Sequence, residues 1–279
     1  MDNFKDKTVV ITGGSEGVGA AAARKFAAAG AKLILVARGR KKLEEIAEEL
    51  RSITEVQFVT MDVSDIDACM NLFRKAEFEF GAVHILVNNA GCHKRGLAEG
   101  VAAEDLGRMI DVNLKAPIIL SRLALPYLRK AEGGAAIINV TSLAGRAPIK
   151  GSATYSASKF GLRTFTFALA EELRGTNIKV AAVSPGPIDT GFIMENVDEV
   201  ADITFSQPIS TADEVAEEIL RLCINDKRER SMPPLSGFLT TLSYLFPGLG
   251  RKVQPVLERR GRKVKKQLKA RKVAANGNA

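Results

Sequence analysis

The chain has 279 residues, of which 46% are hydrophobic, so it is long enough to bury the core of one large domain. No stretch reaches 18 consecutive apolar residues and the N-terminus has no long apolar run, so we expect neither a membrane-spanning helix nor a signal peptide. The net charge is +8, but residues 251–279 carry +10, so the basic character belongs to the C-terminal tail.

The cysteines and histidines do not form a recognisable site. Cys69, Cys92 and Cys223 lack the spacing of metal ligands or of a redox pair, which is typical of reduced thiols in a cytoplasmic protein. His84 and His93 do not group with them, so no metal site is expected.

Short apolar runs alternate along the chain with longer helical segments. The helices are predicted at residues 20–30, 41–52, 66–80, 104–129, around Tyr155, and from residue 211. The strands are predicted at residues 7–12, 32–37, 56–63, 84–91, 135–142 and 178–186. This alternation predicts an α/β fold with a parallel sheet covered by helices on both faces.

A glycine-rich turn follows the first predicted strand. It runs from Thr12 through Gly13, Gly17 and Gly19 and opens a helix. Glycines let the backbone approach a diphosphate, whose charge is favoured at a helix N-terminus. The strand–turn–helix context therefore indicates dinucleotide binding, although the spacing differs from the common GxGxxG form.

The second predicted strand ends without the carboxylate that would bind a ribose 2′-hydroxyl. Cations follow instead, and a 2′-phosphate would pair with Arg38 and be helped by Arg40. The sequence therefore favours NADPH over NADH. A solvated helix start is the alternative interpretation of these cations.

Further candidate residues follow the third and fourth predicted strands. Asp62 and Val63 stand where a carboxylate could reach the adenine amine, and Asn88 to Gly91 end the next strand. Since ligands of such sheets bind at the carboxyl ends of strands, these motifs are expected to meet at one edge.

The fifth strand leads to a candidate catalytic group. Tyr155 and Lys159 are four residues apart and share one helix face, and Ser142 ends the preceding strand. A neighbouring ammonium would lower the pKa of the phenol, so Tyr155 could pass a proton to a carbonyl oxygen held by Ser142. By itself, a YxxxK pair is more often a surface feature.

The motifs TGGSEGVG, NNAG, Asn113, Ser142, YSASK and PGPIDT occur in an order that resembles the short-chain dehydrogenases/reductases over about residues 5–230. The resemblance implies an enzyme with a Rossmann-type doubly wound sheet of about seven strands. It also implies a homodimer or homotetramer, packed through the helices around Asn113 and Tyr155. Glu16 departs from the NADP-preferring members, which often carry a basic residue there.

The resemblance implies roles for individual residues. Tyr155 is the acid/base, Lys159 tunes it and binds the nicotinamide ribose, Ser142 orients the substrate and Asn113 holds a relay water. The implied or expected cofactor contacts are Gly13, Ser15, Glu16, Gly17, Val18, Gly19, Arg38, Arg40, Asp62, Val63, Asn89, Ala90, Gly91, Pro185, Gly186, Ile188 and Thr190.

The C-terminal part changes character after the catalytic motifs. We divide the chain into a catalytic domain at 1–230 and an extension at 231–279 that is first apolar and then basic. Phe192, Ile193, Met194 and Phe205 predict an apolar lid over the substrate. Residues 232–272 suggest peripheral contact with an anionic membrane, with Pro255 and Gly261 weakening a continuous helix. A packed helix with a solvated tail is the alternative.

These features together predict NADPH-dependent reduction of a lipophilic carbonyl, such as a long-chain 3-keto lipid or a steroid-like compound. Oxidation of a secondary alcohol with NAD by the same residues is one alternative. A non-catalytic nucleotide-sensing protein is another, although such proteins usually lose the tyrosine or the lysine. Nucleic-acid binding by the tail is disfavoured because it lacks interleaved aromatic residues.

Overall fold

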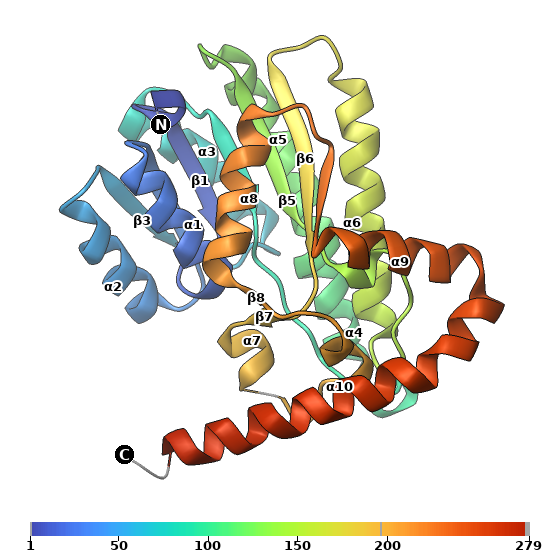
Figure 1. The fold of residues 1–279 in the computed structure, drawn as a ribbon. Coiled ribbons are helices and arrows are strands. Elements are labelled where there is room, and N and C mark those ends of the chain that lie inside the picture. The colour runs from blue at the N-terminus through green and yellow to red at the C-terminus, as the bar shows by residue number, and fades with distance from the viewer. Residues whose placement is uncertain (1, 196, 277–279) are drawn as a thin grey trace.

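Seven parallel strands form the centre of the computed structural model, which describes residues 2–195 and 197–276 (Figure 1). Their order across the sheet is β3-β2-β1-β4-β5-β6-β9. The strands are β1 Thr8–Thr12, β2 Lys32–Ala37, β3 Val56–Thr60, β4 Ile85–Asn88, β5 Ala135–Val140, β6 Ile178–Pro185 and β9 Glu229–Met232. All six strands predicted from the sequence are present, and β9 is the additional strand of this sheet. Two further short strands, β7 (Ile188–Asp189) and β8 (Ser210–Thr211), pair with each other in a separate small sheet.

Helices cover both faces of the sheet, as expected for continuously apolar strands. One layer holds α1 (Gly17–Ala28), α2 (Arg40–Arg51) and α8 (Ala212–Ile224). The other holds α3 (Ile66–Phe80), α5 (Ala116–Lys130) and α6 (Ala153–Glu172). The predicted Rossmann-type doubly wound fold is confirmed.

The strand order reverses between β1 and β4, which are neighbours in the sheet although two strands separate them in the chain. Crossovers therefore leave this point in opposite directions and open a crevice at the carboxyl ends of the two strands. The glycine-rich turn after β1 and Asn89 after β4 both lie there.

The long helix predicted at 104–129 is interrupted. It consists of α4 (Ala103–Ile110), a π-helical turn (Asp111–Lys115) and α5. A π turn adds a residue to the helical repeat and re-aims the side chains within it, and such turns are frequent at functional sites. Asn113 lies in this turn and is fully buried.

The C-terminal extension folds against the domain. The sheet continues through Met232, so the expected boundary at residue 230 falls inside β9. After β9 come α9 (Pro234–Leu245) and α10 (Pro247–Asn276), which is continuous past Pro255 and Gly261, contrary to expectation. Gly261 is where α10 crosses a 3-10 turn at Asp202–Ser206, because a Cβ at this position would lie 1.7 Å from the Asp202 carbonyl oxygen.

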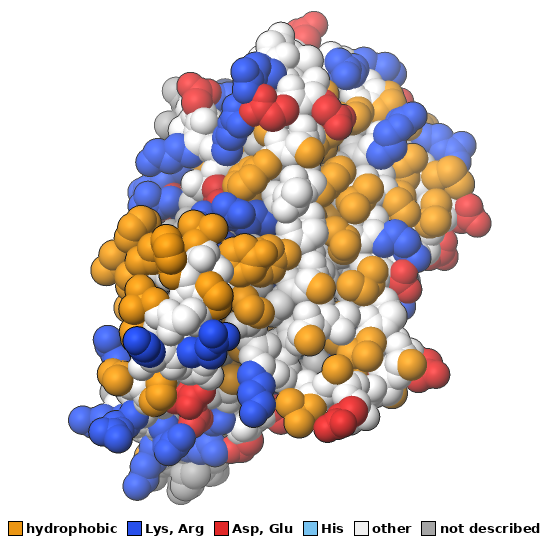
Figure 2. Space-filling model, turned by 90° about the vertical axis from the view of Figure 1, so that its right-hand side faces the viewer, with side chains coloured by type: hydrophobic (Ala, Val, Ile, Leu, Met, Phe, Trp, Pro, Cys, Tyr) orange, Lys and Arg blue, Asp and Glu red, His pale blue; other side chains and the backbone are white. Residues whose placement is uncertain are grey.

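A small third core holds this crossing together. Val264 and Leu268 of α10 pack against Ile193, Val197, Val200 and Phe205. Figure 2 shows a dense group of hydrophobic side chains where α9 meets α10, with basic side chains beside it. Among the described residues, none of the helices is both long and apolar enough to cross a bilayer.

Candidate active site

A cavity of about 1750 Å³ opens along the carboxyl edge of the sheet. Its volume exceeds the roughly 300–1,000 Å³ typical of a site for one small ligand, so a dinucleotide and a second molecule can share it. The cavity brings together nearly all the residues predicted from the sequence. Those lining it are Gly13, Ser15, Glu16, Gly17, Val18, Arg38, Asp62, Val63, Asn89, Ala90, Gly91, Ser142, Tyr155, Lys159, Pro185, Gly186, Ile188 and Thr190. Gly19, Arg40 and Asn113 are outside this lining.

The glycine-rich turn lies close against the segment that follows β4. Gly13 has φ +66°, and a Cβ on it would lie 2.8 Å from the Asn89 side-chain nitrogen. A Cβ on Gly19 would lie 2.0 Å from the Gly13 carbonyl oxygen, so this glycine acts by allowing close packing rather than by lining the cavity. Asn89 Nδ2 donates to the carbonyl oxygens of Thr12 and Gly13, which fixes the turn.

The residues of this region fit a dinucleotide. The N-cap of α1, Glu16, makes no side-chain capping hydrogen bond, so backbone N–H groups of the first turn stay available to a diphosphate. The Oε1 atom of Gln207 is buried beside Gly186 with no hydrogen-bond partner among the described residues. A buried acceptor without a partner is suited to a hydrogen-bond donor of a ligand. Gln207 was not among the residues predicted from the sequence.

The two arginines after β2 point in different directions. Arg38 lines the cavity, whereas Arg40 lies outside it, where it pairs with Glu44 at 3.5 Å and lies over the Phe58 ring. Lys42 also lines the cavity, and its Nζ donates to Glu16 at 2.5 Å. The departure at Glu16 is thus accompanied by a basic partner. Within the described part of the chain, no carboxylate forms an ion pair with Arg38.

Asp62 is held by a cation rather than left free for an adenine. One of its oxygens accepts from the backbone and hydroxyl of Ser64, and the other pairs with Arg108. Burial alone would raise the pKa of Asp62, but these hydrogen bonds outweigh it and lower the pKa to about 2. Asp62 is therefore ionised at neutral pH, and an adenine amine would share it with Arg108.

Ser142 and Lys159 are positioned by the backbone around β5. Ser142 follows the strand and caps a 3-10 turn (Leu143–Gly145) by accepting from the Ala144 N–H at 3.1 Å. Lys159 is buried on α6, and its Nζ donates to the Val140 carbonyl oxygen at 2.9 Å. Burial lowers the pKa of this ammonium to about 8.

Several groups act on the pKa of the buried Tyr155 phenol. Burial raises the pKa of its phenol, while the Ser142 hydroxyl and the charge of Arg95 oppose that rise. Lys159 Nζ lies 5.9 Å from the centre of the tyrosine ring and is directed to Val140. The charge of Arg95 acts on the Tyr155 pKa in this structure, whereas the lowering of that pKa by Lys159 stays a prediction.

The buried Asn113 side chain forms hydrogen bonds with the backbone of the segment that follows β4. Its Oδ1 accepts from the Cys92 N–H at 2.8 Å, and its Nδ2 donates to the Cys92 carbonyl oxygen at 2.8 Å. Through these two bonds the π turn fixes the backbone beside Gly91, where an added Cβ would come within 3.7 Å of Lys159 Nζ. A relay water on Asn113 stays a prediction.

Comparison with known proteins agrees with this geometry. The short chain dehydrogenase family model matches residues 7–201. This chain belongs to that family. Sulfoacetaldehyde reductase 2 of Chromohalobacter salexigens is 40% identical over 187 residues, which cover 67% of this chain and 74% of the relative. An uncharacterised oxidoreductase of Staphylococcus saprophyticus is 36% identical over 211 residues, covering 75% and 83%. The predictions of the family and of an NAD(P)-dependent oxidoreductase are thereby confirmed.

This short-chain dehydrogenase has site residues that sequence reasoning missed. The His93 ring stacks on the Tyr155 ring with centroids 4.0 Å apart, and its Nε2 lies 3.1 Å from the Ser152 hydroxyl. Burial and the charges of Arg95 and Lys159 lower the pKa of His93 to about 3, so it is neutral at physiological pH. The only sequence signal was its position just after NNAG.

The C-terminal extension also contributes to the cavity, beyond the residues that the family model matches. Leu235, Leu239 and Tyr244 of α9 and Leu257 of α10 line it, as do Arg251 and Arg260. Of the predicted lid residues, Phe192 and Ile193 line the cavity, whereas Phe205 is buried against α10. The extension therefore forms part of the cavity wall together with two of the predicted lid residues.

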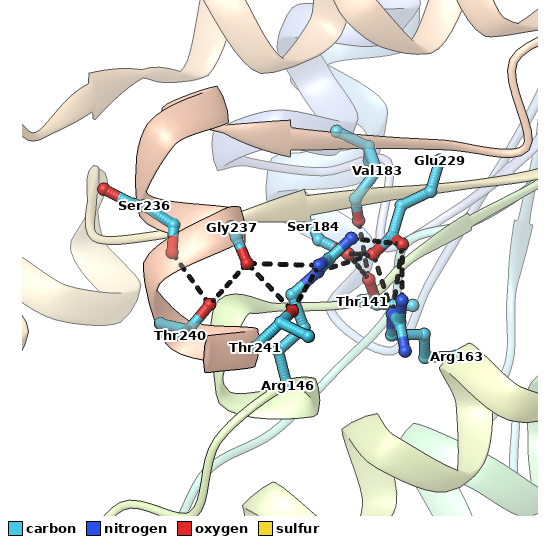
Figure 3. A network of polar contacts seen from close by, with 10 residues as sticks. All are labelled: Thr141, Arg146, Arg163, Val183, Ser184, Glu229, Ser236, Gly237, Thr240 and Thr241. Atoms are coloured by element: carbon cyan, nitrogen blue, oxygen red, sulfur yellow. Dashed lines mark hydrogen bonds and ion pairs between the residues drawn. The ribbon is translucent and has the colours of Figure 1, made fainter. Parts of the chain in front are cut away.

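A buried ionic network joins β9 to α6 and to the residue that follows β5 (Figure 3). The Glu229 carboxylate of β9 accepts from Arg163 of α6 and from the Ser184 hydroxyl at 2.5 Å. Ser184 in turn lies 2.6 Å from the hydroxyl of Thr141, the residue before Ser142. The network therefore joins the strand end that carries Ser142 to the helix that carries Tyr155.

Proposed function

We propose that this protein reduces the carbonyl group of a lipophilic ketone or aldehyde with NADPH. The observation that carries the proposal is that one cavity joins the glycine-rich turn to Ser142 and Tyr155. Apolar side chains make up much of the rest of its lining. The name of the sulfoacetaldehyde reductase relative supports carbonyl reduction.

The residues suit a reduction. The nicotinamide, when bound, supplies the hydride. Ser142 would hold the carbonyl oxygen by its hydroxyl, and Tyr155 would donate its proton to that oxygen as the carbon is reduced. Because the pKa of Tyr155 is raised, the phenol is protonated at neutral pH, which a proton donor requires. Alcohol oxidation with NAD, the alternative, would need the phenolate instead.

NADPH is favoured over NADH by the charge at the end of β2. Arg38 lines the cavity where the 2′-phosphate would lie, and no carboxylate of that strand end is present to bind a ribose 2′-hydroxyl. A guanidinium matches phosphate geometry with paired hydrogen bonds.

A lipophilic substrate is favoured by the apolar side chains in the cavity lining. They include Leu143, Ile149, Phe192, Ile193, Leu235, Leu239 and Leu257. Burying each methylene of a substrate chain there gains about 0.8 kcal/mol. Long-chain 3-keto lipids and steroid-like ketones are therefore the proposed class.

Arg95 favours a second candidate, a small anionic aldehyde. Its guanidinium lines the cavity and donates to the Phe192 carbonyl oxygen at 3.1 Å. Among the described residues no carboxylate forms an ion pair with it. A sulfonate or carboxylate on the substrate could fill that position.

A substrate panel tests the proposal. The protein would be assayed by loss of NADPH absorbance with ketones of increasing chain length and with sulfoacetaldehyde. We expect kcat/KM to rise with chain length. Activity on sulfoacetaldehyde alone would select the second candidate, and no oxidation of NADPH by any carbonyl would refute carbonyl reduction.

We also propose that the protein works in the cytoplasm as a homodimer or homotetramer packed through α5 and α6. Part of the outer face of α6 is covered from within the chain, because Phe160 contacts Tyr244 of α9 with ring centroids 5.2 Å apart. Light scattering of the purified protein tests the oligomer, and a monomer at micromolar concentration would contradict it.

A further inference from the structure

The extension exposes an unusual number of large apolar side chains. We call these the apolar corner: Leu235, Phe238, Leu239, Tyr244, Leu245, Phe246, Leu249, Val253 and Val256, each 42–68% exposed. They follow one another along α9, the turn after it and the start of α10. Figure 2 shows hydrophobic side chains gathered on this part of the surface. Apolar patches of this kind on a folded protein mark an interaction surface.

A row of cations continues from this corner along α10. Lys252, Arg259, Lys263 and Lys266 are spaced by seven, four and three residues, so they share one helix face, which we call the basic stripe. Gly261, Val264 and Leu268 form the opposite face, which packs on the domain. Among the described residues, no carboxylate forms an ion pair with the stripe, whereas Arg262 and Lys265 outside it pair with Asp202.

The cavity reaches the surface at the same corner. Leu235, Leu239 and Tyr244 belong to the apolar corner and also line the cavity. An apolar molecule leaving the surface that the corner covers would therefore meet these three side chains as it enters the cavity.

We propose that the apolar corner and the basic stripe dock this protein on an anionic lipid bilayer, from which a lipophilic substrate enters the cavity. The route of the substrate rests on the proposed function, whereas docking does not. Charge complementarity selects the occupant, because anionic headgroups attract the stripe and a second copy of the chain would bring the same positive charges against it. The α9–α10 helices would lie at the interface rather than span the bilayer.

Vesicle co-sedimentation with the full-length protein tests docking. We expect binding to vesicles of phosphatidylcholine mixed with phosphatidylglycerol, and much weaker binding to phosphatidylcholine alone. Absence of binding to both kinds of vesicle would overturn the proposal. Concentration-dependent self-association that is lost with the corner variant below, without vesicle binding, would assign the corner to a second copy instead.

Paired variants locate the surface. Phe238→Ser with Phe246→Ser should abolish vesicle binding, whereas Phe78→Ser on α3, which is 87% exposed, should not. Lys252→Glu with Lys263→Glu should weaken binding at least about tenfold, given about 1 kcal/mol per cation near an anionic surface. Lys75→Glu with Lys227→Glu is the matched control of equal charge. Equal loss in test and control pairs would overturn the assignment to α9 and α10.

Activity separates docking from the proposed function. The corner and stripe variants should reduce a water-soluble ketone as fast as the wild type. With a long-chain ketone in anionic vesicles, their kcat/KM should fall at least about tenfold, in line with the loss of vesicle binding. Full activity of these variants on the vesicle-borne ketone would overturn delivery from the bilayer. Vesicle binding without reduction of any ketone would refute the proposed function and leave docking intact.

Discussion

Arg146 forms an ion pair with Glu229, and the same guanidinium donates to the Gly237 carbonyl oxygen at 3.2 Å and to the Thr241 hydroxyl at 2.8 Å (Figure 3). The side chains of Arg146 and Glu229 are 14% and 7% exposed. One buried pair therefore connects the turn after Ser142 to α9, the first helix of the extension.

Replacing Glu229 should destabilise the protein and slow catalysis. In Glu229→Gln, the Arg146 and Arg163 guanidiniums lose their shared carboxylate, which costs about 3–5 kcal/mol for a buried pair. The Ser142 turn and α6 would then be less firmly fixed, so kcat should fall. Urea unfolding and steady-state kinetics measure both effects. The control is Glu49→Gln, whose exposed pair with Arg24 contributes about 1 kcal/mol or less. Equal effects of the two variants would contradict the supporting role.

The same carboxylate predicts a dependence of stability on pH. Although burial raises the pKa of Glu229, hydrogen bonds from Arg163, Ser184 and Arg146 outweigh it and hold the pKa below its usual 4.5. The ionised form therefore stabilises the fold above pH 4.5, and this contribution is lost as the pH falls through the lowered pKa. In Glu229→Gln, the acid-side loss of stability should be smaller than in the wild type. Identical acid unfolding curves would contradict this.

Arg38 and Arg40 form a matched pair for cofactor preference. Arg38→Ala should raise the KM for NADPH about tenfold or more, because a hydrogen bond to a charged group contributes about 1.5–3 kcal/mol. The KM for NADH should stay unchanged. Arg40→Ala should leave both values unchanged, since Arg40 faces Glu44 outside the cavity. A lower KM for NADH than for NADPH in the wild type would refute the preference itself.

We expect the buried charge of Lys159 to lower the free energy of unfolding, although the residue is needed for catalysis. Its pKa is lowered from 10.5 to about 8, so the buried charge disfavours the fold below pH 8 by about 3 kcal/mol. Lys159→Met removes this cost and also the hydrogen bond to Val140, so the free energy of unfolding at pH 7 should rise by about 2 kcal/mol while activity is lost. The gain should shrink between pH 8 and 10.5, where the wild type sheds its charge. A variant less stable than the wild type at pH 7 would contradict the account.

Gly261 should be the position at which α10 is fixed to the domain. Gly261→Ala would place a Cβ into the Asp202 carbonyl, so α10 must shift, at a cost of about 1–3 kcal/mol. Limited proteolysis should then cut the extension faster. The control is Gly248→Ala near the start of the same helix, where a Cβ meets no atom within 4 Å. Unchanged proteolysis of Gly261→Ala would show that the helix is not held there.

The sequence predicted most of the fold because parallel strands have a simple pattern. Buried strands such as β2 and β5 are apolar throughout, and motifs that follow successive strands must meet at the same edge. For this reason the sequence alone predicts that Ser142, Tyr155 and the glycine-rich turn share one site. β9 was missed because its residues, ERSM, are mostly polar and its carboxylate faces a buried network rather than an apolar layer.

Contacts between distant parts of the chain could not be predicted in this way. The orientation of Arg40 depends on where α2 begins, since the helix turns that side chain toward Glu44. Phe205 is a large apolar residue, as expected of a lid over a substrate, yet Val264 and Leu268 of α10 cover it. The direction of the Lys159 ammonium likewise depends on the Val140 carbonyl oxygen that accepts from it, rather than on its spacing from Tyr155.

Replacement of the Tyr155 hydroxyl tests the central claim most directly. Tyr155→Phe keeps the ring that stacks on His93 and removes only the proton donor. We expect kcat for ketone reduction to fall at least about a hundredfold, with the Kd for NADPH, measured by fluorescence, within about twofold of the wild type. Ketone reduction by Tyr155→Phe at the wild-type rate would contradict the assignment of Tyr155 as the proton donor.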